Sequence, residues 1–167
     1  MSDTANRPLD LRELFRLLAA ERVEYLVIGG VAAQVHGRRR TTKDLDIIPA
    51  PDEANLQRLA VALVALEASP AELEGTSRAV PTAEQLRHAP IVPPLATRHG
   101  ELHILSDVPG AAAYAELRAR ALVVELDGIP LAIVSVDDLI RMKRAVGRPG
   151  DLEDIAAITA LARGSEN

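Results

Sequence analysis

The chain lacks cysteine and tryptophan, and its 167 residues include only two tyrosines and one phenylalanine. The missing cysteine excludes disulfides, thiol catalysis and Cys-ligated zinc. Aromatic residues make up 2% of the chain and hydrophobic residues 48%. A core must therefore be built from leucine, valine, isoleucine and alanine. The length predicts a single domain over residues 1–167.

Long apolar runs and an excess of positive charge are also missing. No run is long enough for a membrane span, and the N-terminus does not have the pattern of a signal peptide. We therefore expect a cytoplasmic protein with no membrane partner. The formal net charge of −5 gives no overall attraction to nucleic acid. Contact with RNA or DNA would need a local basic patch, and the segment from Arg38 to Lys43 offers one.

Hydrophobic patterns typical of helices and of strands follow one another along the chain, but without a regular βαβ repeat. We predict an α/β (α+β) fold with a mixed β-sheet flanked by helices and with a helical C-terminus. The predicted helices cover residues 9–21, 30–36, 53–66, 111–119, 136–146 and 151–162, and a helical turn is predicted over residues 82–88. The predicted strands cover residues 23–28, 43–48, 101–105, 122–126 and 129–134, with a strand fragment and loop over 67–81. Asp52 and Ser135 are predicted helix caps.

The most informative segment has Gly29-Gly30 after a predicted strand, and Asp44 and Asp46 on the next strand. Side chains at i and i+2 of a strand point to the same face. Two carboxylates there repel each other unless a cation lies between them, and oxygen ligands favour Mg²⁺ or Mn²⁺. The glycines would let backbone N–H groups approach a phosphate at a helix N-terminus. Together these features suggest chemistry on a nucleoside triphosphate. The alternative is that one aspartate is an exposed strand end and the other pairs with an arginine.

Gly-Gly, a short helix and Asp-x-Asp on the next strand resemble the signature of the polymerase-beta-like nucleotidyltransferase superfamily. The segments around Gly29, around His36, from Arg40 to Asp46 and from Asp138 to Asp154 resemble its small AbiEii-like and MNT-like members. The resemblance implies a nucleotidyltransferase fold, Mg²⁺ (or Mn²⁺) as cofactor and an NTP as substrate. Several of these relatives are toxins of toxin–antitoxin systems. A toxin role, a tRNA or other RNA acceptor and a cognate antitoxin protein are therefore expectations from the resemblance.

The resemblance also suggests which side chains act. In the superfamily the two aspartates hold metals that bridge the triphosphate, and a third carboxylate on a neighbouring strand acts as general base. His103 occupies that third position here. A neutral imidazole could still accept a proton or bind a metal, and Glu101, on the same strand face, could reach the metal with its longer side chain.

Beside a triphosphate site, Arg40 could contact phosphate through charge-assisted hydrogen bonds. The resemblance implies that Lys143 acts on the nucleotide phosphates as a mobile point charge. Asp151 and Asp154 share a face of the last predicted helix. One of them could bond Lys143 or Arg148, or contact the sugar or acceptor. Alternatively, both only stabilise the start of that helix.

Three interpretations follow. The first is a metal-dependent nucleotidyltransferase whose acceptor is an RNA 3′ end, a protein side chain or a small molecule. The second is a degenerate relative that binds nucleotide or a protein partner without catalysis, which the replacement at His103 favours. The third is an interaction module in which the glycines only form a turn. We expect His36 to have a packing role and no part in catalysis.

Overall fold

The computed structural model describes residues 7–71, 79–89 and 91–164. Its helices are α1 (Leu11–Ala20), α2 (Gly29–Val35), α3 (Glu53–Ala65), α4 (Ala83–His88), α5 (Tyr114–Arg120), α6 (Val136–Val146) and α7 (Pro149–Gly164). Its strands are β1 (Tyr25–Ile28), β2 (Asp44–Pro49), β3 (Ser69–Pro70), β4 (Leu95–Thr97), β5 (Gly100–Ile104), β6 (Leu122–Leu126) and β7 (Ile129–Ile133). Much of the segment predicted as strand fragment and loop, residues 72–78, lies outside the described residues.

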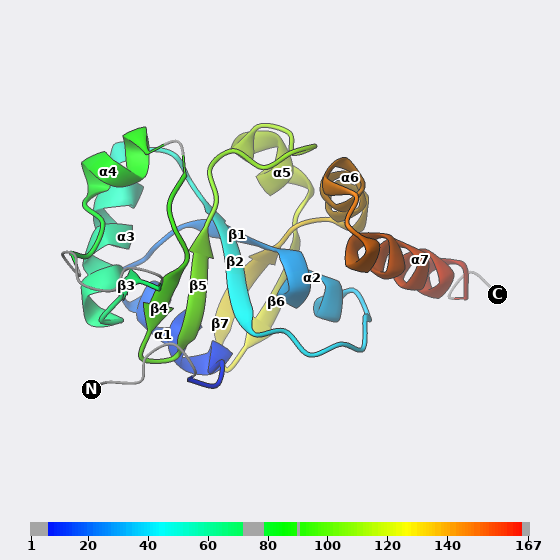
Figure 1. Ribbon diagram of the computed structural model, residues 1–167, viewed down its shortest axis with the longest axis horizontal. Coiled ribbons are helices and arrows are strands. Elements are labelled where there is room, and N and C mark those ends of the chain that lie inside the picture. The colour runs from blue at the N-terminus through cyan, green and yellow to red at the C-terminus, as the bar shows by residue number, and fades with distance from the viewer. Residues whose placement is uncertain (1–6, 72–78, 90, 165–167) are drawn as a thin grey trace.

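The strands form one mixed sheet in the order β3-β4-β5-β2-β1-β7-β6. β2 runs parallel to β5, and β1 runs parallel to β7, while the other neighbouring pairs are antiparallel. Figure 1 shows α3 and α4 at one side of the sheet, and α6 and α7 at the opposite side, beyond α2. The predicted mixed sheet with flanking helices and a helical C-terminus is therefore confirmed.

The core is aliphatic, as the composition predicts. Leu14, Phe15 and Leu18 form the buried stripe of α1, and β1, β2 and β5 contribute mostly leucine, isoleucine and valine. Phe15 is the one aromatic side chain among the buried hydrophobic residues that the structure describes, and its ring stacks on Tyr25 with centroids 6.4 Å apart. Within the described ranges, no helix has both the length and the apolar character needed to cross a membrane.

Helix ends follow local chemistry. The side chains of Asp52 and Ser135 accept hydrogen bonds from backbone N–H groups of α3 and α6, so both predicted caps are confirmed. Two predicted starts are wrong. α5 begins at Tyr114 instead of residue 111, because Ala113 has a non-helical ψ of 148° and the chain before it makes a turn closed by the Ala111 N–H and the Val108 carbonyl. α7 begins at Pro149, since proline suits the first turn of a helix.

Asn55 is a fully buried polar side chain that ties α3 to the ends of β1 and β2. Its Oδ1 accepts from the backbone N–H of Glu24 at 2.7 Å. Its Nδ2 donates to the carbonyls of Glu24 and Ala50 at 2.8 and 3.0 Å. Buried backbone groups need such partners, so this amide fixes where β1 begins and where the chain leaves β2.

We predict that Asn55→Ala lowers the free energy of unfolding by about 3 kcal/mol, because buried backbone groups lose their partners. Urea unfolding followed by circular dichroism measures the change. The control is Gln57→Ala, on the exposed side of the same helix, which should stay within about 0.5 kcal/mol of the parent. Equal stability of the two variants would show that the Asn55 amide does not hold the strand ends.

Candidate metal and nucleotide site

The two aspartates of β2 lie on one face of the strand. Asp44 and Asp46 are half-buried, while Leu45 and Ile47 between and beyond them point into the core and are fully buried. The parallel register places Asp44 opposite Glu101 and Asp46 opposite His103 on β5. Three carboxylates and one imidazole therefore come together across two neighbouring strands.

His103 bridges two of these carboxylates. Its Nδ1 lies 2.9 Å from Oδ1 of Asp46, and its Nε2 lies 2.6 Å from Oε1 of Glu101. The hydrogen bond with Asp46 raises the pKa of His103 to about 9; burial opposes the rise, and Glu101 adds to it. The imidazole is therefore protonated at neutral pH in the metal-free molecule, unlike the neutral ring considered from the sequence. Glu101 contacts His103 instead of reaching toward the aspartate pair.

Asp44 shows the cost of crowding like charges. Burial raises the pKa of Asp44, and the Asp46 carboxylate adds to the rise. One ligand atom from each of Asp44, Asp46 and His103 lies within 4.8 Å of the others. Two carboxylates and an imidazole at this separation fit a divalent cation, which would also relieve the repulsion. The donor set thus fits the metal that the sequence motif predicts.

The glycine pair allows the aspartate strand to approach α2. Gly29 has a φ of +64°, and a Cβ there would lie 2.0 Å from Oδ2 of Asp46. At Gly30 a Cβ would lie 2.7 Å from Oγ1 of Thr42. These protein contacts alone are enough to require glycine at both positions. The proposed phosphate contact of Gly29 and Gly30 therefore stays a prediction.

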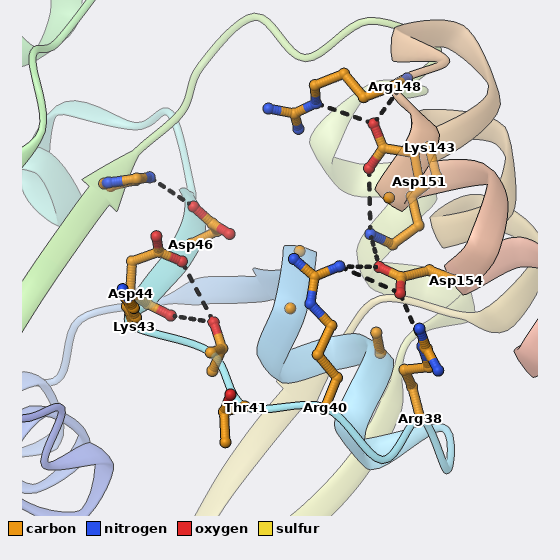
Figure 2. A pocket seen from close by; sticks show the side chains of 16 residues that line it. Arg38, Arg40, Thr41, Lys43, Asp44, Asp46, Lys143, Arg148, Asp151 and Asp154 are labelled. Atoms are coloured by element: carbon orange, nitrogen blue, oxygen red, sulfur yellow. Dashed lines mark hydrogen bonds and ion pairs between the residues drawn. The ribbon is translucent and has the colours of Figure 1, made fainter.

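On the opposite side, Asp154 holds three cationic side chains (Figure 2). It is 2% exposed, and it accepts from Nζ of Lys143 and Nε of Arg38, each at 2.9 Å. Nη1 of Arg40 lies 3.4 Å from the same carboxylate. The labelled side chains in Figure 2 show these groups facing Asp44 and Asp46 across open space.

Asp151 completes this wall. Its carboxylate lies 3.5 Å from Nζ of Lys143 and accepts from Nε of Arg148 at 3.0 Å. It also accepts from the backbone N–H of Arg148 at 3.2 Å, at the start of α7. Both alternatives for the α7 carboxylates therefore apply, because Asp151 pairs with the cations and also stabilises the helix start.

One cavity of about 500 Å³ joins the two walls. It is lined by Gly29, Gly30, Ala33, Arg38, Arg40, Thr41, Thr42, Lys43, Asp44, Asp46, His103, Lys143, Arg148, Gly150, Asp151 and Asp154. Of the catalytic and nucleotide-binding candidates named from the sequence, Glu101 is not part of this lining. His36 is outside it, where its Nε2 lies 2.7 Å from the Val134 carbonyl, in keeping with a packing role.

Some cavity residues are missing from the sequence-based site. The sequence gives Asp154 no role distinct from that of Asp151, yet the Asp154 carboxylate contacts three cations. Arg38 and Arg40 both contact Asp154. Their two-residue spacing is the sequence signal that both side chains lie on one side of the chain. Thr42 also lines the cavity, and its hydroxyl donates to the Asp44 carbonyl at 3.1 Å. Nothing in the sequence marks that threonine apart from its neighbours.

No family model and no curated protein sequence matches the chain. Solved structures that share its fold include the following two. One is a Thermotoga maritima protein provisionally assigned as a nucleotidyltransferase, with 16% identity, a TM-score of 0.51, and coverage of 92% of this chain and 91% of that one. The other is an antigenic nucleotidyltransferase-like protein of Paracoccidioides brasiliensis, with 19% identity, a TM-score of 0.51, and coverage of 92% and 78%. The chain therefore has the nucleotidyltransferase fold.

We predict that Gly29→Ala disrupts the aspartate strand, because an added methyl would overlap Asp46 at a backbone angle that alanine rarely adopts. Its free energy of unfolding should fall by about 2 kcal/mol or more. Gly164→Ala is the control, since nothing lies within 4 Å of a Cβ there. Thermal unfolding separates the two, and a parent-like midpoint for Gly29→Ala would contradict the close approach.

We also predict that Asp154→Asn destabilises the protein by about 2–4 kcal/mol at pH 7, because the buried Lys143 and the partly buried Arg38 lose a charged partner. Burial alone would raise the pKa of Asp154, but hydrogen bonds from Arg38 and Lys143 hold it below its ordinary value. This stabilisation is complete above the ordinary carboxyl pKa of ~3.9 and is lost as the pH falls through the lower folded value. The deficit of the variant should therefore shrink in acid.

Urea unfolding at pH 7 and at pH 3 checks this expectation. Glu153→Gln is the matched control, since this neighbouring carboxylate is exposed and lies 3.9 Å from Arg38. A deficit that is the same at both pH values would mean that the Asp154 charge contributes nothing.

Proposed function

We propose that the protein is a metal-dependent nucleotidyltransferase that moves a nucleotide from an NTP to an acceptor and releases pyrophosphate. The observation that carries this proposal is a single cavity with Asp44, Asp46 and His103 on one wall and Lys143 and Arg40 on the other. Its volume of about 500 Å³ lies within the ordinary range for small-molecule sites. The nucleotidyltransferase fold adds support.

The two walls suit a nucleoside triphosphate. Asp44, Asp46 and His103 would hold the divalent cation, which when bound neutralises charge on the reacting phosphate. Arg40 has a half-exposed guanidinium, only loosely held at 3.4 Å from Asp154, so it can turn to the phosphates. Lys143 would act as a point charge on the outer phosphates. Its ion pairs with Asp151 and Asp154 keep the ammonium in place before substrate binds.

The acceptor and partner are finer parts of the same proposal. The resemblance to AbiEii-like and MNT-like proteins supports a toxin–antitoxin role, with a tRNA or other RNA as acceptor and a cognate antitoxin as partner. A protein side chain or a small molecule is the alternative acceptor. We further propose that residues 1–167 act as a single nucleotidyltransferase-like domain.

A second candidate is a protein that binds nucleotide without catalysis, and His103 favours it. The protonated imidazole lies between Asp46 and Glu101. It therefore supplies positive charge to a carboxylate that would otherwise need a cation. In this second candidate the ring replaces part of the metal's electrostatic role, and no group on β5 acts as a base toward an acceptor hydroxyl.

The test is incubation of the purified protein with each labelled NTP, Mg²⁺ or Mn²⁺, and a mixture of cellular RNA and protein. We expect label transfer to one acceptor, and a loss of about 100-fold or more in Asp44→Asn, which removes a metal ligand. Asp107→Asn, at an exposed position beyond β5, is the control. NTP binding that needs Asp44 but gives no transfer would support the second candidate, and no NTP binding would reject both.

A further inference from the structure

Glu101, His103 and Asp46 form a continuous chain of polar contacts across β5 and β2. The Glu101 carboxylate contacts Nε2 of His103 at 2.6 Å, and Nδ1 of the same ring contacts Asp46 at 2.9 Å. The ring is three-quarters buried. Each ring nitrogen therefore has a carboxylate partner. Nε2 contacts Glu101, and Nδ1 contacts Asp46 on the cavity wall.

We propose that Asp44, Asp46 and Nδ1 of His103 form a mixed oxygen–nitrogen site that selects Mn²⁺ and related transition ions over Mg²⁺, with Glu101 as the positioning residue for His103. This inference rests on the proposed function, since it concerns the cation of the same cavity.

The ligand types carry the selectivity. Mg²⁺ prefers oxygen ligands in near-ideal octahedral geometry and gives up its waters reluctantly. An imidazole nitrogen suits transition ions, whereas carboxylates serve both classes. A site of Asp44 and Asp46 alone would therefore discriminate weakly. A cation bound here would displace the Nδ1 proton, and the imidazole nitrogen of His103, within 4.8 Å of both aspartate oxygens, would then shift the balance toward the transition ions.

Glu101 has the position of an outer partner. A histidine that binds a metal through one nitrogen commonly donates its other N–H to a carboxylate, which fixes the ring orientation and raises its basicity. Here Nε2–H of His103 donates to Glu101, which leaves Nδ1 on the side of Asp46. The Glu101 side chain is 38% exposed and is not one of the three grouped ligands. Its effect on a cation would therefore pass through the imidazole.

The test measures the affinity of the full chain for Mn²⁺ and for Mg²⁺ alone, without nucleotide. Titration of free Mn²⁺ by electron paramagnetic resonance gives the Mn²⁺ affinity, and displacement by Mg²⁺ gives the second affinity. We expect tighter Mn²⁺ binding, with nitrogen coupling from imidazole in the spin-echo spectrum. His103→Asp should remove that coupling and reduce the preference for Mn²⁺ by about 10-fold or more.

Glu101→Gln should weaken Mn²⁺ binding by about 10- to 100-fold, as for other outer-shell partners, and should change Mg²⁺ affinity much less. Glu125→Gln is the matched control, on exposed β6 away from the cavity, and should change neither affinity. Thermal unfolding verifies that each variant is folded.

The outcomes separate this inference from the proposed function. Equal affinity for Mn²⁺ and Mg²⁺, both lost in Asp44→Asn, would overturn the selectivity and leave the metal site in place. Mn²⁺ binding without nitrogen coupling, or unchanged in Glu101→Gln, would overturn the roles given to His103 and Glu101. No binding of either ion would overturn the inference together with the metal-dependent function.

Discussion

Repulsion among carboxylates on neighbouring strands is the constraint on which the site depends. Asp44, Asp46 and Glu101 face the same side of the sheet, and the fully buried Leu45 fixes the face to which β2 presents its aspartates. The sheet cannot relieve the crowding by turning the strand, because that would expose core residues to water. Compensation must come from a positive group between them. In the metal-free molecule that group is His103, and its contacts with Asp46 and Glu101 are the direct result.

On the opposite wall of the cavity the crowded charges are positive, and carboxylates compensate them. Lys143 and the two arginines that reach Asp154 would repel one another, and the buried Asp154 and Asp151 hold them in one arrangement. These groups come from the loop before β2 and from α6 and α7, so the cavity exists only when distant parts of the chain meet. Such an arrangement is ready for an anion before one arrives, because the cations need little reorganisation.

Local features of the sequence predicted local structure well. The alternation around Asp44 gave the correct strand face, and Asp52 and Ser135 gave correct helix starts. The predicted starts of α5 and α7 are wrong, because a turn precedes α5 and a proline occupies the first turn of α7. The contacts of His103 with two carboxylates depend on the register between β2 and β5, which no local pattern contains. The sequence offers a phosphate contact or a simple turn as the reason for the Gly29-Gly30 pair, whereas its nearest neighbours are the side chains of Asp46 and Thr42.

The register that sets His103 beside Asp46 also has a genetic consequence. Aspartate and histidine codons differ only in their first base, so a single G-to-C or C-to-G change converts one residue into the other. The backbone of β5 would not need to change, since both residues occupy the same strand position. The mixed cluster of two aspartates and a histidine is therefore one point mutation away from an all-carboxylate cluster, and drift in either direction needs no intermediate sequence.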